Sequence, residues 1–489
     1  MKMLFKILKL CAIGTAAAAL LFWGAALLID RAGIMPLRQI IARFRFSPER
    51  VSRSAALRDV DDFFSTLERV HPDVEINIGH DAYVKMKRQT IAEVNNKSSA
   101  NGSMTVRDLA YVLSYSAAAI GDGHTRINYR YDIDTTDAKK RFLPFAVASN
   151  DGRFVISRDP GGQFGGAEII AINGTPFKEF LRPVLEHISG ETLKFRAYQF
   201  ARDQSFWSDF SGLFSGLGSF NAALRLKDGA IKKVGFNTAD AAGTVSVCSG
   251  TQGGGVSLDV YHKAGVGWIS YASFDNSEQQ KQEISGIFKR LRTEGIRDLV
   301  LDLRGNLGGD SSMGDLIFSY ISREKVTQLN GKIKISKELL RAFPRLKYLK
   351  AHLGEVVNTD SDKGASPVPE DFFSGRVYLV VDNGSYSSAS AFAAAFRDHK
   401  IGKILGYETG EPPIAFGNAL KFSLPHSGIR YTVSACRYFP RKPLPGDDKH
   451  GIIPDIVLND TLLRPYGGRV KDLVVDSIVK RRMQKDMQL

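Results

Sequence analysis

The sequence predicts an α/β protein with a mixed, mostly parallel sheet, preceded by a helical N-terminal region and a small β-rich module. From about residue 243 onward, strand-like apolar runs alternate with helical segments, which is typical of parallel strands joined by crossover helices. Residues 56–119 carry apolar side chains at helical spacing, whereas residues 142–240 hold short β-like runs separated by glycine and proline. A chain of 489 residues is long enough for such a division into domains.

The helical region is expected to contain at least two helices. Apolar residues recur at helical spacing from Leu57 to Val70, which predicts an amphipathic helix. A second helix is expected from Val106 to Ile120, directly after Thr105. It ends at a turn bracketed by glycines, Gly121-Asp122-Gly123-His124-Thr125. Of the nine histidines, only His124 stands in a glycine-rich turn directly after an apolar helix, so we take it as a candidate functional residue.

The β-rich module is expected to contain strands over Arg153–Ser157 and Glu168–Ile172. The second strand closes with Asn173-Gly174, a turn in which glycine supplies a positive φ, and a short helix follows over Phe177–Ile188. This strand–turn–helix order resembles part of a PDZ-like domain. The carboxylate-binding Gly-Leu-Gly-Phe loop typical of such domains is not found in the sequence.

The last part of the chain alternates between the two kinds of element. Strands are expected over Val266–Phe274, Asp298–Leu303, Val377–Val381, Ile401–Leu405 and Ile429–Val433, and helices over Glu283–Thr293, Ser388–Phe396 and Val470–Met487. Residues 355–370 are polar and rich in Asp, Ser and Pro, which indicates a surface loop.

A glycine-rich turn follows one of these buried strands, in Asp302-Leu303-Arg304-Gly305-Asn306-Leu307-Gly308-Gly309-Asp310. Adjacent glycines allow the backbone to turn several N–H groups toward one point, as an oxyanion site requires. The segment lacks the Gly-Lys-Ser/Thr of a nucleotide-binding P-loop, so we exclude that function.

A second turn joins a buried strand to an Ala-rich helix, in Asp382-Asn383-Gly384-Ser385-Tyr386-Ser387-Ser388-Ala389. A serine at such a junction lies where a helix N-terminus stabilises negative charge. The alternative is that these serines only cap the helix and pack closely as small residues. The pattern of this turn alone leaves both interpretations open.

Together, the turn at His124 and the two turns after buried strands resemble the tail-specific (C-terminal processing) protease family of serine peptidases, type S41. The closing segment Gly451-Ile452-Ile453-Pro454-Asp455 also follows in the order of that family. The resemblance covers residues 105–130 and 260–460. It implies a ClpP/crotonase-like protease core, with Ser387 as nucleophile and the backbone N–H groups of Gly308 and Ser388 as oxyanion donors.

The general base implied by the resemblance is a histidine. Members that use a serine–lysine dyad carry lysine where this chain has Pro412, and Lys400 and Lys403 flank or begin a strand and look solvent-facing. Tricorn-like members use an upstream histidine, and His124 matches that pattern. His426 and His450 are the rival histidines, which we interpret as loop residues.

The acid partner of His124 is left open by the sequence. Glu408, in the turn Gly406-Tyr407-Glu408-Thr409-Gly410, is the tentative choice. Asp447 and Asp448, which precede the Pro-Asp segment, are the alternatives. Each of these residues could equally be structural.

Composition narrows the possible partners. The formal net charge is +14, from 66 basic and 52 acidic residues, but the excess is scattered and does not predict a nucleic-acid surface. Cys11, Cys248 and Cys436 have no CxxC or histidine partner at metal-ligand spacing, so we expect neither zinc nor any other metal or cofactor. Cys248 and Cys436 either pair in an oxidising compartment or lie apart as small buried residues.

The N-terminus predicts membrane attachment. Leu10 to Ile29 is a nearly continuous apolar run without a charge, and about 20 such residues cross a bilayer as a helix. Lys2, Lys6 and Lys9 precede it, which favours a cytoplasmic start. A cleaved signal peptide is the alternative, although its apolar region is usually shorter. We therefore expect a single-pass signal anchor in a bacterial inner membrane, with the catalytic part in the periplasm or outside the cell.

The sequence thus predicts a serine-type endopeptidase that hydrolyses peptide bonds in exported proteins or peptides. The alternative is a catalytically inactive relative that binds a peptide or a hydrophobic ligand in the same cleft. The oligomeric state is left open. The expected division is 1–30 signal anchor, 31–55 linker, 56–140 helical region, 141–240 PDZ-like module, 241–460 protease core and 461–489 helical tail.

Overall fold

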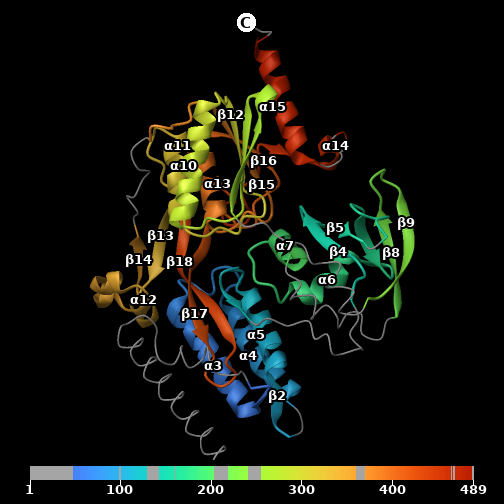
Figure 1. Ribbon diagram of the computed structural model, residues 1–489. Coiled ribbons are helices and arrows are strands. Elements are labelled where there is room, and N and C mark those ends of the chain that lie inside the picture. Colours follow the sequence, from blue (N-terminus) through green and yellow to red (C-terminus); the bar gives the residue numbers. More distant parts are fainter. Residues whose placement is uncertain are drawn as a thin grey trace, which may run out of the picture.

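The computed structural model describes residues 48–98, 101–128, 142–159, 161–202, 218–239, 255–359, 369–463, 465 and 469–486. Its centre is a six-stranded sheet in the order β10-β11-β12-β15-β16-β19 (Figure 1). The strands are β10 Val256–Tyr261, β11 Val266–Tyr271, β12 Asp298–Asp302, β15 Arg376–Val381, β16 Gly402–Gly406 and β19 Ile456–Val457. β10 is antiparallel to β11 and the other neighbours are parallel, which confirms the predicted α/β class with a mostly parallel sheet.

The central sheet is covered on both faces, as mostly parallel sheets generally are. The covering helices are α10 Glu278–Thr293, α11 Ser312–Ile321, α13 Ser388–Asp398 and α15 Val470–Asp486. The first three pack on one face, in an apolar core that includes Leu379 and Phe392. α15 packs on the other face, in a separate core that includes Trp268 and Tyr378. Because both faces are apolar, all five residues of β12 are buried.

A second, antiparallel sheet lies next to the central one, in the order β14-β13-β18-β17 with β3 against the start of β18. Its strands are β3 Arg126–Ile127, β13 Leu329–Lys334, β14 Val356–Thr359, β17 Ala415–Ser423 and β18 Arg430–Pro440. The strand expected over Ile429–Val433 forms here and is not part of the parallel sheet. The reason is that β17 and β18 are joined by a short connection, which enforces antiparallel pairing. β14 also occupies part of the segment expected to be a loop.

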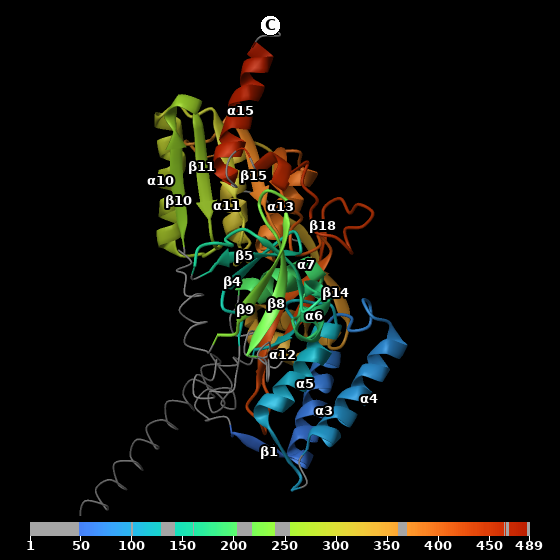
Figure 2. The same cartoon turned by 90° about the vertical axis from the view of Figure 1, so that its right-hand side faces the viewer.

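The N-terminal helices pack under this second sheet. They are α3 Arg53–Val70, α4 His80–Lys97 and α5 Val106–Ala119, with β1 Arg50–Ser52 and β2 Ser103–Thr105 pairing beside them. The Thr105 hydroxyl accepts a hydrogen bond from the Asp108 N–H and so caps α5. Phe63 of α3 stacks edge-on against Tyr431 of β18, and both belong to one apolar core. In both views these helices lie at the end of the molecule opposite α15 (Figures 1 and 2).

The β-rich module has its own sheet and its own apolar core. Its strands are β4 Ala146–Asn150, β5 Arg153–Arg158, β6 Glu168–Ile172, β7 Thr175–Pro176, β8 Ser219–Arg225 and β9 Ile231–Asn237, and its helices are α6 Phe177–Leu185 and α7 Leu193–Arg202. Helix α7 is the module's element closest to the central sheet (Figure 1). The Lys194 ammonium at its start donates to the Glu408 carboxylate at 2.8 Å, so the module is tied to the loop that follows β16.

The predicted membrane location requires correction. In the part of the chain that the structure describes, no helix is long and apolar enough to cross a bilayer. A single-pass anchor in an inner membrane, and the location drawn from it, are therefore not supported. The segment Leu10–Ile29 on which the prediction rested lies outside the described residues, as do Cys11 and Cys248. Cys436 is buried in β18.

Candidate active site

Ser387 stands at the junction of β15 and α13, where a buried strand turns sharply into a helix. Its backbone has a φ of +55° and a ψ of −125°, a conformation that non-glycine residues rarely adopt. Such strain persists only where the surroundings enforce it, and it is concentrated at functional sites. Here the Ser385 hydroxyl donates to the Leu303 carbonyl at 2.7 Å, and the Asp382 carboxylate accepts the Gly384 N–H at 2.9 Å. The turn therefore places Ser387 at the N-cap position of α13.

The glycine-rich turn after β12 lies directly against this junction. The Tyr386 N–H donates to the Asn306 carbonyl at 3.0 Å, which joins the two turns. Gly308 has a φ of +92°, and a Cβ there would lie 2.7 Å from the Ser388 nitrogen and 2.8 Å from the Ser387 Cβ. Only glycine fits such a close approach of two backbones.

His124 comes from the turn after α5, and three hydrogen bonds hold this turn in place. The backbone N–H of His124 donates to the Asp122 carboxylate at 2.8 Å, and its backbone carbonyl accepts a hydrogen bond from the Thr432 hydroxyl at 2.7 Å. The next residue, Thr125, accepts the Ser434 N–H through its hydroxyl at 3.1 Å. Strand β18 therefore fixes the position of His124 relative to α13.

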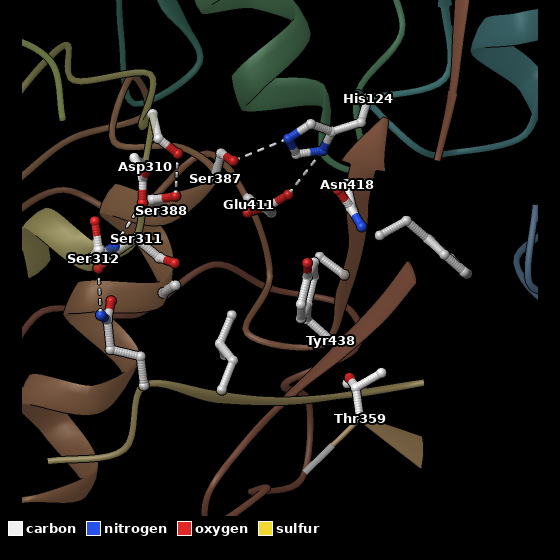
Figure 3. Close-up of a pocket in the computed structure, with 18 of the residues that line it drawn as sticks. His124, Asp310, Ser311, Ser312, Thr359, Ser387, Ser388, Glu411, Asn418 and Tyr438 are labelled. Atoms are coloured by element: carbon white, nitrogen blue, oxygen red, sulfur yellow. Dashed lines mark hydrogen bonds and ion pairs between the residues drawn. The ribbon is translucent and has the colours of Figure 1, made fainter. Parts of the chain in front are cut away.

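The imidazole of His124 lies between Ser387 and a carboxyl group (Figure 3). Its Nε2 is 3.0 Å from the Ser387 Oγ. On the other side, Nδ1 is 3.4 Å from the Glu411 Oε1, 3.2 Å from the Tyr386 hydroxyl and 3.9 Å from the Asp122 Oδ1. A hydroxyl, an imidazole and a carboxyl group in this order form the arrangement that activates a serine for attack on a carbonyl.

Burial governs the protonation of this cluster. It lowers the pKa of His124 below its usual value, against the opposing charge of Asp122, so the imidazole is neutral near pH 7. Burial raises the pKa of Glu411 well above its usual range, and the charges of Glu191 and Asp122 add to this effect. The pKa of Asp122 is lowered instead, because the hydrogen bond and charge of His71 outweigh the effect of burial.

The other residues predicted for the site lie elsewhere. Glu408 accepts from the Lys194 ammonium at 2.8 Å and from the Gly451 N–H at 2.9 Å, and the structure does not bring it to His124. Asp447 receives both guanidinium nitrogens of Arg397. The two rival histidines have other surroundings. His426 accepts a hydrogen bond from the Arg58 guanidinium at 3.1 Å, and His450 is exposed to solvent. Glu411 is therefore the carboxyl group that faces His124 in place of Glu408.

The loop that carries Glu411 is tied to α13. The backbone carbonyl of Glu411 accepts hydrogen bonds from the Ser390 hydroxyl at 2.7 Å and the Thr409 hydroxyl at 3.0 Å. Glu408 and Glu411 are three residues apart in the same loop, so the path of the loop decides which of them faces the histidine. Pro412 and Pro413 directly after Glu411, which restrict that path, were the available signal in the sequence.

The backbone N–H groups available beside Ser387 differ in part from those expected. The Gly308 N–H already donates to the Asn306 side-chain oxygen at 2.8 Å. Among the described residues, the N–H groups of Gly309 and Ser388 have no hydrogen-bond acceptor, and both residues line the cleft beside Ser387. The Ser388 hydroxyl donates to the Gly309 carbonyl at 2.7 Å, which holds the two segments together.

A cleft of about 720 Å³ opens in front of Ser387 and His124. Asp310, Ser311 and Ser312 line one side of it, and Asn418, Tyr438 and Thr359 line the other (Figure 3). The second sheet thus supplies one wall of the cleft, and the helices of the central sheet supply the opposite wall. A volume of this size holds several residues of an extended peptide.

The side chains of Asp122, His124 and Glu191 have ligand atoms within 4.8 Å of one another, a spacing compatible with a metal ion. These side chains also contact other protein groups, however. Asp122 lies 3.3 Å from the buried His71 Nε2, and Glu191 accepts the Gly123 N–H at 3.0 Å. We therefore treat the cluster as part of the hydrogen-bond network of the site.

The fold and the site define the class of this protein as a serine peptidase. Residues 265–458 match the model of peptidase family S41, and this match supports a serine peptidase of the tail-specific type. Two solved structures share its fold. Mature CPAF has 15% sequence identity and a TM-score of 0.63, covering 88% of this chain and 98% of its own. Mature CPAF complexed with lactacystin has 14% identity and a TM-score of 0.60, covering 88% and 99%. A search of curated proteins found no match.

Proposed function

We propose that this peptidase is an endopeptidase that cleaves polypeptides through Ser387, with His124 as general base and Glu411 as the acid partner. The observation that carries the proposal is the 3.0 Å contact between the Ser387 Oγ and the His124 Nε2. A serine hydroxyl is inert at its free pKa, and a base within this distance can take its proton during attack. The neutral state of His124 near pH 7 is the state that a general base needs.

In this mechanism His124 removes the Ser387 proton as the hydroxyl attacks the peptide carbonyl, and it then returns the proton to the leaving amine. Glu411 stabilises the imidazolium formed in between. The N–H groups of Ser388 and Gly309 receive the oxyanion, replacing the predicted donor Gly308. The dipole of α13, which begins at Ser388, adds to this stabilisation because its positive end faces the new negative charge.

Fluorophosphonate labelling tests this proposal without knowledge of the substrate. The full-length wild type is expected to form a covalent adduct, Ser387→Ala none, and His124→Ala an adduct only at a rate lowered by orders of magnitude. Circular dichroism of each variant controls for folding. A folded wild type that is not labelled would contradict the proposal and favour the inactive, ligand-binding relative.

The labelling rate is also expected to depend on pH. Glu191 faces the same cluster, and burial together with the charge of Asp122 raises its pKa to about 8. A group with this pKa goes from about one tenth ionised at pH 7 to about nine tenths at pH 9. Since Glu411 also has a raised pKa, the anionic charge that stabilises the imidazolium appears as pH increases. We expect the rate constant to rise about tenfold from pH 7 to pH 9, and a rate that falls over this interval would refute the assignment.

A further inference from the structure

Tyr386, the residue before the nucleophile, has a side chain that extends away from the cleft into the buried cluster. Its ring stacks on Phe195 of α7, with centroids 3.9 Å apart and planes within 4°. Its hydroxyl lies opposite Gly123, where a Cβ would come within 2.3 Å of the oxygen. The ring is therefore held between the β-rich module and the turn that carries His124.

The Tyr386 hydroxyl bridges two functional groups. It is 3.0 and 3.1 Å from the two Glu191 carboxylate oxygens and 3.2 Å from the His124 Nδ1. An ionised carboxylate only accepts hydrogen bonds, so the hydroxyl must donate its proton to Glu191. A lone pair of the same oxygen then faces Nδ1. Of the side-chain oxygens around Nδ1 it is the nearest, because the Glu411 Oε1 is 3.4 Å away and makes no hydrogen bond within the described residues.

We propose that Tyr386 and Glu191 are positioning residues that fix the tautomer of His124. With the hydroxyl proton directed to Glu191, Tyr386 accepts the Nδ1–H of the imidazole, and Nε2 stays unprotonated to take the proton of Ser387. This inference rests on the proposed function, since it concerns the same base. It also means that the β-rich module contributes a side chain to the catalytic centre, because Glu191 lies between α6 and α7, two residues before α7 begins.

The protonation of Glu191 decides the direction of this hydrogen bond. When its carboxyl group is protonated, it can donate to the Tyr386 oxygen, and the hydroxyl proton then turns toward Nδ1. The histidine is left with its proton on Nε2, where it cannot act as the base. The other titratable or charged groups around Glu191 are Asp122, His124, Glu411 and Arg196, and of these Asp122 and Glu411 oppose its ionisation.

Two substitutions test the inference through the rate constant of fluorophosphonate labelling. Tyr386→Phe keeps the ring and its stacking but removes the hydroxyl, and we expect the rate to fall about tenfold at pH 9, the effect of one lost hydrogen bond to the reacting base. Glu191→Gln places an amide N–H against the Tyr386 oxygen, because the Gln oxygen is needed by the Gly123 N–H. We expect this variant to be slow at all pH values and to lose the rise between pH 7 and pH 9.

Matched controls separate positioning from general structural effects. Tyr378→Phe removes the hydroxyl of a buried tyrosine on the face of β15 that α15 covers. Glu186→Gln neutralises an exposed carboxylate in the segment that precedes Glu191. Both controls should label like the wild type. Tyr386→Phe at the wild-type rate, or Glu191→Gln with an unchanged pH profile, would overturn the inference while leaving the proposed function intact. A wild type that is not labelled would instead reject the proposed function.

Discussion

Glu411→Gln is expected to lower the rate of peptide hydrolysis by about 1,000- to 10,000-fold. Burial raises the pKa of Glu411, so its negative charge appears as the pH rises; the amide keeps the geometry but lacks this charge, which stabilises the imidazolium. Glu411 is 5% exposed, so water cannot replace the lost charge. The measurement is the hydrolysis of fluorescently labelled casein by the full-length protein, together with the fluorophosphonate labelling rate at pH 9.

Glu408→Gln is the matched comparison because it makes the same change three residues away in the same loop. Its carboxylate bonds to Lys194 and to the Gly451 N–H, so we expect a lower melting temperature but a hydrolysis rate within a few-fold of the wild type. The reverse result, with Glu408→Gln inactive and Glu411→Gln active, would restore the acid partner that the sequence suggested.

Gly308→Ala is expected to reduce hydrolysis by about 100-fold or more, because it displaces the nucleophile and the oxyanion donor together. The new Cβ would lie 2.7 Å from the Ser388 nitrogen and 2.8 Å from both the Ser387 Cβ and the Tyr386 carbonyl oxygen. Two of these three atoms belong to the backbone and cannot rotate away. A shift of about 1 Å at a reacting group can cost on the order of 100-fold in rate.

The control for this substitution is Gly286→Ala. Gly286 lies on the exposed side of α10, and a Cβ there meets no atom within 4 Å. Alanine is the better helix former, so this variant should be fully active and slightly more stable. Full activity of Gly308→Ala, measured beside it, would show that the two turns are not as tightly apposed as the structure indicates.

The parts of the fold that the sequence predicted well depend on local patterns. β6 begins and ends at the expected residues, and β12 and β15 differ by a residue at one end, because buried strands read as short apolar runs between turn signals. The antiparallel sheet of β13, β14, β17 and β18 was not anticipated. Its pairing joins segments about 100 residues apart, such as Ile333 and Cys436, and no local pattern records such a contact.

The same distinction applies to the site. Ser387 and His124 could be singled out because each stands in a short glycine-containing turn beside an apolar element. The structure brings them together. Glu411 was not separated from Glu408, since both stand in one loop and only the prolines that follow Glu411 distinguish them. Glu191 was not considered at all, because its contact with Tyr386 spans 195 positions and arises only when α7 packs on the turn that carries Ser387.

The anchoring of His124 by β18 has a consequence for the time at which activity appears during synthesis. The histidine is near the start of the described chain, the serine follows some 260 residues later, and Thr432 and Ser434, which hold the histidine turn, come later still. A growing chain in which Ser387 has already been synthesised therefore still lacks β18, the strand that positions His124. If the proposed mechanism holds, the growing chain is expected to stay inactive until β18 has emerged and folded.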